Sequence, residues 1–244
     1  GAAEIAADVE VVALAAAALA ALGIDGVSVD LTLPRLVPML IDALGFTPDR
    51  AEALKEALDH KDAATVARLG GANAALFERL LASAGPAEAA LVALAGLKLP
   101  PAAAAECRRL EAVVASLTEA GAPLGLTIDA VENRGFEYHT GISFTFFARG
   151  SRGELGRGGR YRADAGEPAT GFTLYTDTIL QVAPAPAAER RLYVPADTPH
   201  AAARGAREAG YVTVAGLAPI ADIVAEARRL HCGYVLSGGE IRSL

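Results

Sequence analysis

The chain has 244 residues, a formal net charge of −7 and a hydrophobic fraction of 52%, with few aromatics and no Trp. This length permits one large domain or two ordinary ones, with a sizeable core. Nucleic-acid affinity depends on neutralising phosphates with Lys and Arg, so an acidic chain with scattered basic residues argues against extended contact with a polyanion.

The apolar run at 11–22 is too short to span a bilayer, which needs about twenty apolar residues. Acidic side chains precede it within residues 4–10, where a secretory signal would be basic. We therefore predict no membrane segment and a cytoplasmic location. Cys107 and Cys232 match no metal spacing, so we predict free thiols and no metal site. We also predict no cofactor.

The first half of the chain is predicted to be mainly helical. Apolar spacing predicts a helix over 3–22, a half-buried strand over 27–31 and a second helix over 34–45. The pattern remains helical throughout 47–121. Within that segment, Gly and Pro residues divide the pattern into helices at 48–59, 61–69, 73–84, 86–95 and 101–120.

The pattern changes to strands from residue 122. Strands are predicted at 124–129 and 136–147, and residues 150–159 have the composition of a flexible, charged loop rich in Gly and Arg. Residues 168–181 are predicted to return to a strand and then a helix.

The C-terminal segment follows a short Ala/Pro linker at 183–188. Its predicted elements alternate strand and helix, at 191–195, 198–209, 211–215, 219–230 and 233–236. This order favours a small sheet with helical crossovers.

The strand predicted at 136–147 has two different faces. One is apolar and carries Phe136, Tyr138, Ile142, Phe144 and Phe146. The other carries Glu137, His139, Gly141, Ser143 and Thr145. The polar face is consistent with a wet cleft in which Gly141 allows a ligand to approach. It is equally consistent with an antiparallel sheet that has one solvated face, in which Gly141 marks a bulge.

Residues 134–141 read Arg-Gly-Phe-Glu-Tyr-His-Thr-Gly. They resemble the first histidine-recognition signature, Arg-Gly-Leu-Asp-Tyr-Tyr, of histidyl-tRNA synthetases and of their non-catalytic relatives, the regulatory subunits of ATP phosphoribosyltransferase. By position, Arg134 and Tyr138 match the signature, Glu137 replaces its aspartate, and His139 takes the place of its second tyrosine. The resemblance implies that these four residues line an amino-acid pocket. A lone histidine such as His139 can also be a hydrogen-bonded structural residue.

A second signature, Gly-Gly-Arg-Tyr, lies at 158–161. Paired glycines, here Gly158 and Gly159, let the backbone approach a small ligand, and a following arginine can hold a carboxylate through a bidentate fork. The resemblance therefore implies that Arg160 and Tyr161 belong to the same pocket. Taken alone, the motif would be a turn with a solvated arginine.

A third stretch, at 168–172, resembles the opening of the last synthetase motif. The synthetases continue this motif to an arginine that holds the ATP phosphates, where this chain has Thr178, and Tyr175 replaces a glycine. Phosphoryl chemistry relies on fixed positive charge, which Thr178 cannot supply. The resemblance therefore implies a disabled adenylation site.

For the fold, the resemblance implies an α+β protein with a class II synthetase-like antiparallel sheet, flanking helices and a helical insertion. We expect 1–46 and 122–183 to form the core, without the amino-terminal part of the family's fold. We expect 47–121 to be the insertion, and 189–244 to be a small α/β domain that resembles a shortened anticodon-binding domain.

For function, the resemblance implies a non-catalytic regulatory subunit of ATP phosphoribosyltransferase, which takes part in histidine feedback control of histidine biosynthesis. It implies a homodimer within a hetero-oligomer, a short catalytic subunit as partner, L-histidine as effector and no tRNA. The alternatives are a histidyl-tRNA synthetase fragment, which would activate histidine with ATP and charge tRNA, and a stand-alone paralogue that binds or transfers amino acids.

Overall fold

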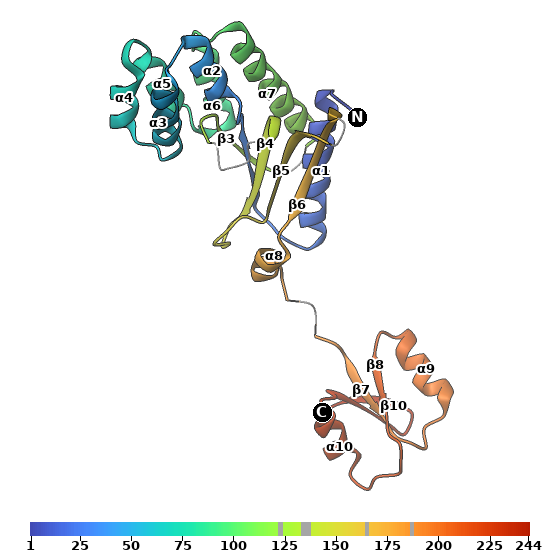
Figure 1. The fold of residues 1–244 in the computed structure, drawn as a ribbon. Helices are drawn as coiled ribbons and strands as arrows, with labels where there is room; N and C mark the ends of the chain where they lie inside the picture. The colour runs from blue at the N-terminus through green and yellow to red at the C-terminus, as the bar shows by residue number, and fades with distance from the viewer. Residues whose placement is uncertain (122–123, 133–137, 164–165, 186–187) are drawn as a thin grey trace. The chain divides into compact units, whose positions relative to one another are not determined.

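The computed structural model describes residues 1–121, 124–132, 138–163, 166–185 and 188–244. The chain divides into two compact units, Gly1–Pro184 and Ala185–Leu244, called here the N-terminal and C-terminal units. Each unit has its own sheet (Figure 1). The N-terminal unit has one large cluster of buried apolar side chains, and the C-terminal unit has two smaller ones. None of the helices in the described parts of the chain is long and apolar enough to cross a membrane.

The N-terminal unit is built on a six-stranded, mostly antiparallel sheet with the strand order β2-β3-β1-β4-β5-β6. Its strands are β1 (Val27–Thr32), β2 (Gly85–Pro86), β3 (Gly125–Asp129), β4 (His139–Ala148), β5 (Gly156–Arg162) and β6 (Pro168–Leu174). Only β1 and β3, among the described strands of this sheet, pair in parallel. The predicted α+β class is therefore confirmed.

The helices of this unit lie close to the predicted positions. They are α1 (Ile5–Ala21), α2 (Leu36–Leu44), α3 (Pro48–Asp59), α4 (Ala63–Gly70), the short 3-10 helix η1 (Gly71–Asn73), α5 (Ala74–Leu81), α6 (Ala87–Ala95), α7 (Pro101–Glu119) and α8 (Thr176–Val182). Local signals explain the boundaries. Proline occupies the first position of α3 and α7, Gly45 ends α2 in the left-handed conformation, and the Asp62 side chain caps α4 by accepting from the Thr65 amide.

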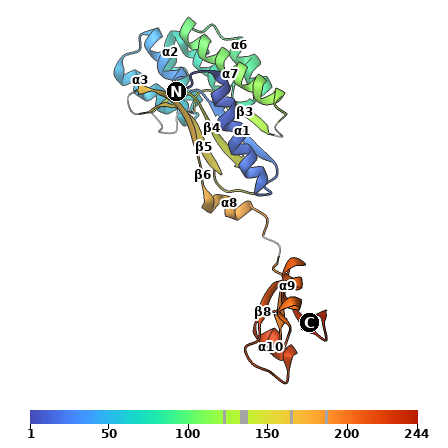
Figure 2. The ribbon, with the colours of Figure 1, turned by 90° about the vertical axis from the view of Figure 1, so that its right-hand side faces the viewer.

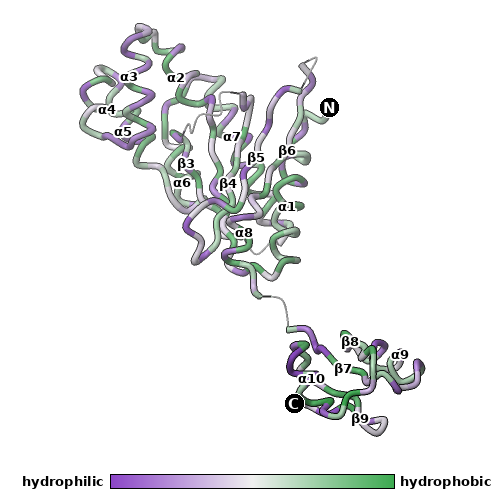
Figure 3. Tube along the Cα trace, turned by 60° about the horizontal axis from the view of Figure 1, so that its bottom comes forward, coloured by the Kyte–Doolittle hydropathy of each residue, from purple (hydrophilic) through white to green (hydrophobic). Residues whose placement is uncertain are grey.

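Helices α1 and α7 cover one face of the sheet (Figure 2). Apolar side chains of both helices pack with those of β1 and β4, including Val12, Leu19, Val29, Leu110, Val113 and Phe146. The tube of α1 is coloured hydrophobic along much of its length, as expected for a helix that supplies this layer (Figure 3). The opposite face of the sheet carries mainly polar side chains.

The structure corrects the prediction of a flexible loop at 150–159. Strand β5 begins at Gly156 and pairs with β4 on one side and β6 on the other. A Cβ at Gly156 would lie 2.7 Å from the Leu174 side chain, so the neighbouring strand comes too close for a larger residue. The Gly and Arg content resembles that of a loop, but here the glycines serve close strand packing.

The C-terminal unit has a four-stranded sheet with the order β10-β9-β7-β8. Its elements are β7 (Arg191–Val194), α9 (His200–Glu208), β8 (Val212–Ala215), α10 (Ile223–Arg229), β9 (Tyr234–Ser237) and β10 (Glu240–Ser243). Strand β7 pairs in parallel with both β8 and β9, as the predicted crossovers require. Separate apolar clusters form under α9 and under α10, so the two helices cover opposite faces.

Strand β10 was not predicted. It pairs antiparallel with β9 through a turn at Gly238 and Gly239, whose φ angles are 61° and 84°. A two-residue hairpin turn whose twist matches that of the strands needs positive φ at both central residues. Gly-Gly between two short apolar runs is therefore a sequence signal for a hairpin. The sequence therefore contains a local signal for β10 at Gly238 and Gly239.

Candidate functional site

The open face of the N-terminal sheet carries polar residues in register across its strands. One such row joins Asp129, Thr32, Ser143, Gly159 and Gly171, and the next joins Thr127, Asp30, Thr145, Arg157 and Thr173. The hydroxyl oxygens of Thr32 and Ser143 are 2.5 Å apart, and the Thr127 hydroxyl donates to Asp30 at 2.6 Å. Side chains alternate between the two faces of a strand, so this polarity follows directly from the sequence once the register is fixed.

A cleft of about 350 Å³ opens on this face at β5 and β6. Its described lining residues are Tyr138, Arg157, Gly158, Gly159, Tyr161, Gly171, Phe172, Thr173 and Tyr175. The Tyr138 ring centroid lies 4.3 Å from that of His139 and 5.9 Å from that of Tyr161. The structure thus brings together one tyrosine from each signature.

Tyr138 lies on the opposite side from the one that strand alternation predicted. It was placed on the apolar face of the strand, yet its side chain is 55% exposed and lines the cleft. Strand β4 begins only at His139, so Tyr138 precedes the ladder and the two-residue period does not apply to it. The predictions for Ile142, Phe144 and Phe146 are confirmed, because all three are buried.

His139 is 5% exposed, and its ring lies over Gly159, where an added Cβ would come within 2.9 Å of Nε2. Burial, and secondarily the positive charge of Arg157, lower the pKa of His139 below its ordinary value of 6.5. Burial therefore favours the neutral imidazole, which packs against Tyr138 and is not among the residues that line the cleft.

This lowered pKa predicts a pH-dependent stability. In the unfolded chain His139 takes up a proton near pH 6.5, while in the folded chain it does so only at lower pH. The contribution of His139 to the free energy of unfolding is therefore present above pH 6.5 and is lost as the pH falls below it. Wild type is expected to lose part of its free energy of unfolding between pH 7 and pH 5 because of His139. We expect His139→Gln to remove that part of the pH dependence. An identical slope in both proteins would contradict the assignment.

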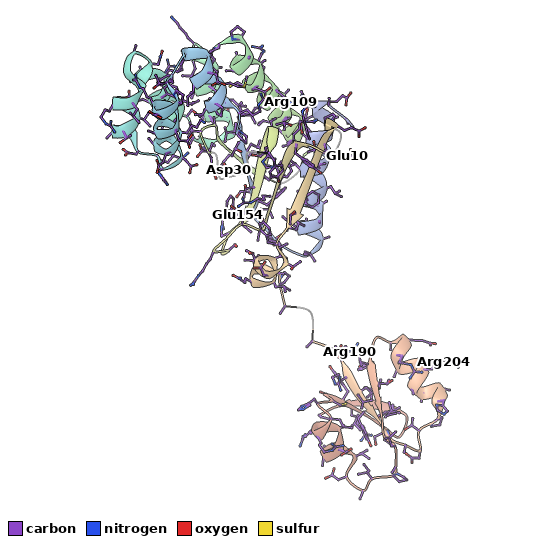
Figure 4. All side chains as sticks on the ribbon, in the orientation of Figure 1. Glu10, Asp30, Arg109, Glu154, Arg190 and Arg204 are labelled. Atoms are coloured by element: carbon purple, nitrogen blue, oxygen red, sulfur yellow. The ribbon has the colours of Figure 1, made fainter. Side chains whose placement is uncertain are left out.

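Arg160 does not face the cleft, contrary to the prediction that it holds a ligand carboxylate. Its guanidinium is buried on the helix-covered face and pairs with Asp8 of α1 at 2.9 Å. Arg109 of α7, labelled in Figure 4, pairs with the same carboxylate at 2.8 Å. The two arginines also donate to backbone carbonyls of residues 2–4. Arg160 therefore fastens the beginning of α1 to the sheet.

The paired glycines are also explained by packing within the protein. A Cβ at Gly158 would lie 2.6 Å from the Phe144 ring and would overlap the carbonyl oxygen of Gly171. A Cβ at Gly159 would meet Ser143 at 2.8 Å as well as His139. The space that the missing side chains leave is therefore filled by neighbouring strands, not by a ligand, although both glycines line the cleft through their backbone.

Gly141 marks a β-bulge, and not a position at which a ligand approaches the strand. The pairing of β4 with β5 shifts register between His139 and Ser143. A Cβ at Gly141 would lie 3.1 Å from the Arg160 side chain. The close approach at this position is made by an arginine of the same chain, since the bulge turns Gly141 toward the helix-covered side.

Arg157 is the functional candidate that sequence reasoning missed. It lies on β5 two residues before Gly159 and four before Tyr161, so all three face the cleft. Its Nε donates to Glu154 at 2.7 Å, and its Nη2 pairs with the same carboxylate. Strand periodicity would have identified Arg157 if residues 156–162 had been predicted as a strand.

Two predicted pocket residues, Arg134 and Glu137, lie outside the described residues, so their predicted roles stay predictions. Tyr175, which replaces a glycine of the synthetase motif, lines the cleft. Thr178, at the position of the motif's arginine, lies on α8 next to Gly153, with 3.8 Å between the Thr178 methyl and a Cβ built on that glycine.

Lys61, in the turn between α3 and α4, contacts the open face of the sheet. This residue has φ of 57°, an uncommon conformation for a side chain other than glycine, and its Nζ lies 2.6 Å from the carboxylate of Asp129. Asp129 is at the end of β3, in the same row as Thr32 and Ser143. The ion pair therefore ties the turn between α3 and α4 to the edge of the candidate site.

The C-terminal unit has a cavity of about 530 Å³ at the carboxyl ends of its parallel strands. It is lined mainly by apolar residues, with Asp197, Thr198 and Ser237 as polar members. This unit contains seven Arg and six Asp or Glu residues, among them Arg190 and Arg204 of Figure 4, for a formal net charge of +1. This unit therefore does not share the acidity of the whole chain, whose formal net charge is −7.

Among the described residues, no group of three or more His, Cys, Asp or Glu side chains is arranged to hold a metal ion. The cleft on the N-terminal unit is lined by the rings of Tyr138, Tyr161 and Tyr175, by the backbone of Gly158 and Gly159, and by the guanidinium of Arg157, which the Glu154 carboxylate holds.

The sheet with its helices on one face and an open polar cleft on the other has the fold of a class II aminoacyl-tRNA synthetase core. A solved structure from Bacillus halodurans, described as an ATP phosphoribosyltransferase regulatory subunit/histidyl-tRNA synthetase, superposes with a TM-score of 0.77. The match covers 94% of this chain and 64% of that chain at 21% identity, a level at which the likeness concerns the fold.

The family model described as histidyl-tRNA synthetase matches residues 1–179, and the chain belongs to this family. A protein from Rhodospirillum centenum is 52% identical over 100% of this chain, and one from Paramagnetospirillum magneticum is 55% identical over 94% of it. Both are named ATP phosphoribosyltransferase regulatory subunit. The chain spans 64% and 61% of their lengths, respectively.

Proposed function

We propose that this chain is part of a regulatory subunit of ATP phosphoribosyltransferase, which acts in the first step of histidine biosynthesis. The observation that carries the proposal is the 52% identity, over the whole chain, to a protein of that name. In this proposal the subunit forms a homodimer within a hetero-oligomer and associates in the cytoplasm with a short catalytic subunit.

The proposed role of the cleft is to bind L-histidine as a feedback effector. Tyr138 and Tyr161 offer aromatic surface for an imidazole ring, and the buried His139 packs against Tyr138. Arg134 and Glu137 remain in the proposed site by resemblance alone. Binding of histidine regulates the complex only if it favours one conformational state of the assembly over another.

The subunit is proposed to have no catalytic activity of its own. Activation of histidine with ATP needs fixed positive charge around the phosphates, and the motif position of the synthetases' arginine holds Thr178. Tyr175 adds bulk where that motif has a glycine. Both differences weaken the case for a nucleotide site on this sheet.

The proposal predicts a stable complex with the catalytic subunit. When the full-length protein that contains this chain is co-expressed with a short ATP phosphoribosyltransferase subunit, the two are expected to co-elute in size-exclusion chromatography. Phosphoribosyl transfer by the complex is expected to be inhibited by L-histidine. Separate elution of the two proteins at micromolar concentration would contradict the proposal.

The second candidate function is histidyl-tRNA synthetase activity, which the family model favours by its description. It requires histidine-dependent exchange of pyrophosphate into ATP, followed by charging of tRNA. We expect neither activity, because Thr178 replaces the cationic residue. Detection of either one in the full-length protein would favour this candidate over the regulatory subunit.

A further inference from the structure

We propose that Arg157, and not the signature arginine Arg160, holds the carboxylate of the amino-acid effector in the cleft. The inference rests on the proposed effector site and adds to it the residue that recognises the charged end of the ligand. Arg160 is unsuited to this role because its guanidinium is buried against Asp8 on the opposite face of the sheet.

Arg157 lies in the cleft, where its guanidinium can contact a ligand carboxylate. Among the described residues that line the cleft, it carries the one charged side chain. It lies in register with Thr145 on β4 and Thr173 on β6, so hydroxyl groups flank it on both neighbouring strands. Among the described lining residues, Arg157 is therefore the one cation that an anionic ligand group can contact, and it shares its charge with Glu154.

Glu154 fixes the orientation of this guanidinium. Both the Nε and the Nη2 groups of Arg157 are engaged by one oxygen of the Glu154 carboxylate, three residues earlier in the chain. The side chains of the pair are 23% and 14% exposed, so solvent screens them only partly. A planar guanidinium held along one edge is pre-organised to recognise a second carboxylate, which reduces the entropy lost on binding.

The arrangement also sets the direction of the ligand. Arg157 and Gly159 are two residues apart on the same face, a separation of about 7 Å along the strand. The aromatic pair of Tyr138 and Tyr161 lies beyond Gly159, at the other end of the cleft. A small amino acid can therefore place its carboxylate at Arg157 and its ring between Gly159 and the tyrosines.

The test uses isothermal titration of the full-length protein with L-histidine and with L-histidine methyl ester, which lacks the negative charge. Wild type is expected to bind histidine about 10- to 100-fold more tightly than the ester, the range for one charge-assisted hydrogen-bonding contact. In Arg157→Gln, histidine binding is expected to weaken by the same factor while ester binding stays nearly unchanged, so the discrimination disappears. Arg152→Gln, which changes an exposed arginine of the preceding loop, is expected to leave both affinities unaltered.

A second variant keeps the inference testable if Arg157→Gln does not fold. Arg157→Lys retains the charge as a single point contact, and it is expected to keep part of the preference for histidine. If wild type binds histidine but does not prefer it to the ester, or if Arg157→Gln keeps the preference, the inference fails and the proposed effector site stands. If wild type binds no histidine at all, both fail.

Discussion

Replacement of Asp8 by alanine is expected to lower the free energy of unfolding of the N-terminal unit by about 3–5 kcal/mol, the range for removing one partner of a buried ion pair. The Asp8 carboxylate accepts from Arg160 and Arg109 and is 2% exposed, while the Arg160 side chain is 7% exposed. Without Asp8, a buried guanidinium would lose its counter-charge. The carbonyl groups of residues 2–4 that also accept from these arginines carry no net charge to replace it.

Chemical denaturation of the full chain, with the unfolding of α1 and β5 followed by hydrogen exchange, measures this effect. The matched control is Glu10→Ala, which removes an exposed acid from the same helix and is expected to change stability by no more than about 0.5 kcal/mol. Combining Asp8→Ala with Arg160→Met is expected to restore part of the loss, because removing both partners costs less than removing one. A loss below about 1 kcal/mol, typical of exposed ion pairs, would contradict the buried-pair interpretation.

Gly158→Ala is expected to destabilise the N-terminal unit by about 3 kcal/mol, at the upper end of the range for overpacking. The added methyl group would overlap the carbonyl oxygen of Gly171 on β6 and approach the buried ring of Phe144 to 2.6 Å. A backbone carbonyl cannot move without disturbing the pairing of β5 with β6, so rotation of a side chain cannot relieve the clash.

Gly171→Ala provides the control for this prediction on the neighbouring strand. Its Cβ would make ordinary contacts with Tyr161, at 3.7 Å from a ring carbon and 3.8 Å from the hydroxyl oxygen, so the change is expected to be close to neutral. The free energies of unfolding of the two variants are compared by thermal unfolding in parallel. A loss in Gly158→Ala alone would show that close packing at Gly158, and not a general intolerance of larger residues in these strands, is the cause. Equal losses for both would show that the specific contacts at Gly158 do not decide its identity.

The cleft shows how far the sequence alone can group the residues of a candidate site. The two signatures predicted that Tyr138, His139 and Tyr161 lie together, and their rings do lie side by side. The signature arginine, Arg160, does not face the cleft. Residues an odd number of positions apart in a strand face opposite sides of the sheet. Arg160 therefore lies on the helix-covered face, while Arg157 lies in the cleft.

The sequence by itself determined the positions of the predicted helices, because these depend on local periodicity and capping residues. It determined the family, and through that resemblance the class of fold, by the residues and order of its motifs. The tertiary structure alone decided the strand pairing of Gly156–Arg162, the bulge at Gly141 and the partner of each arginine. These features depend on contacts between residues far apart in the chain, such as Asp8 with Arg160 or Gly158 with Gly171. No local pattern encodes which strand approaches another, or how closely.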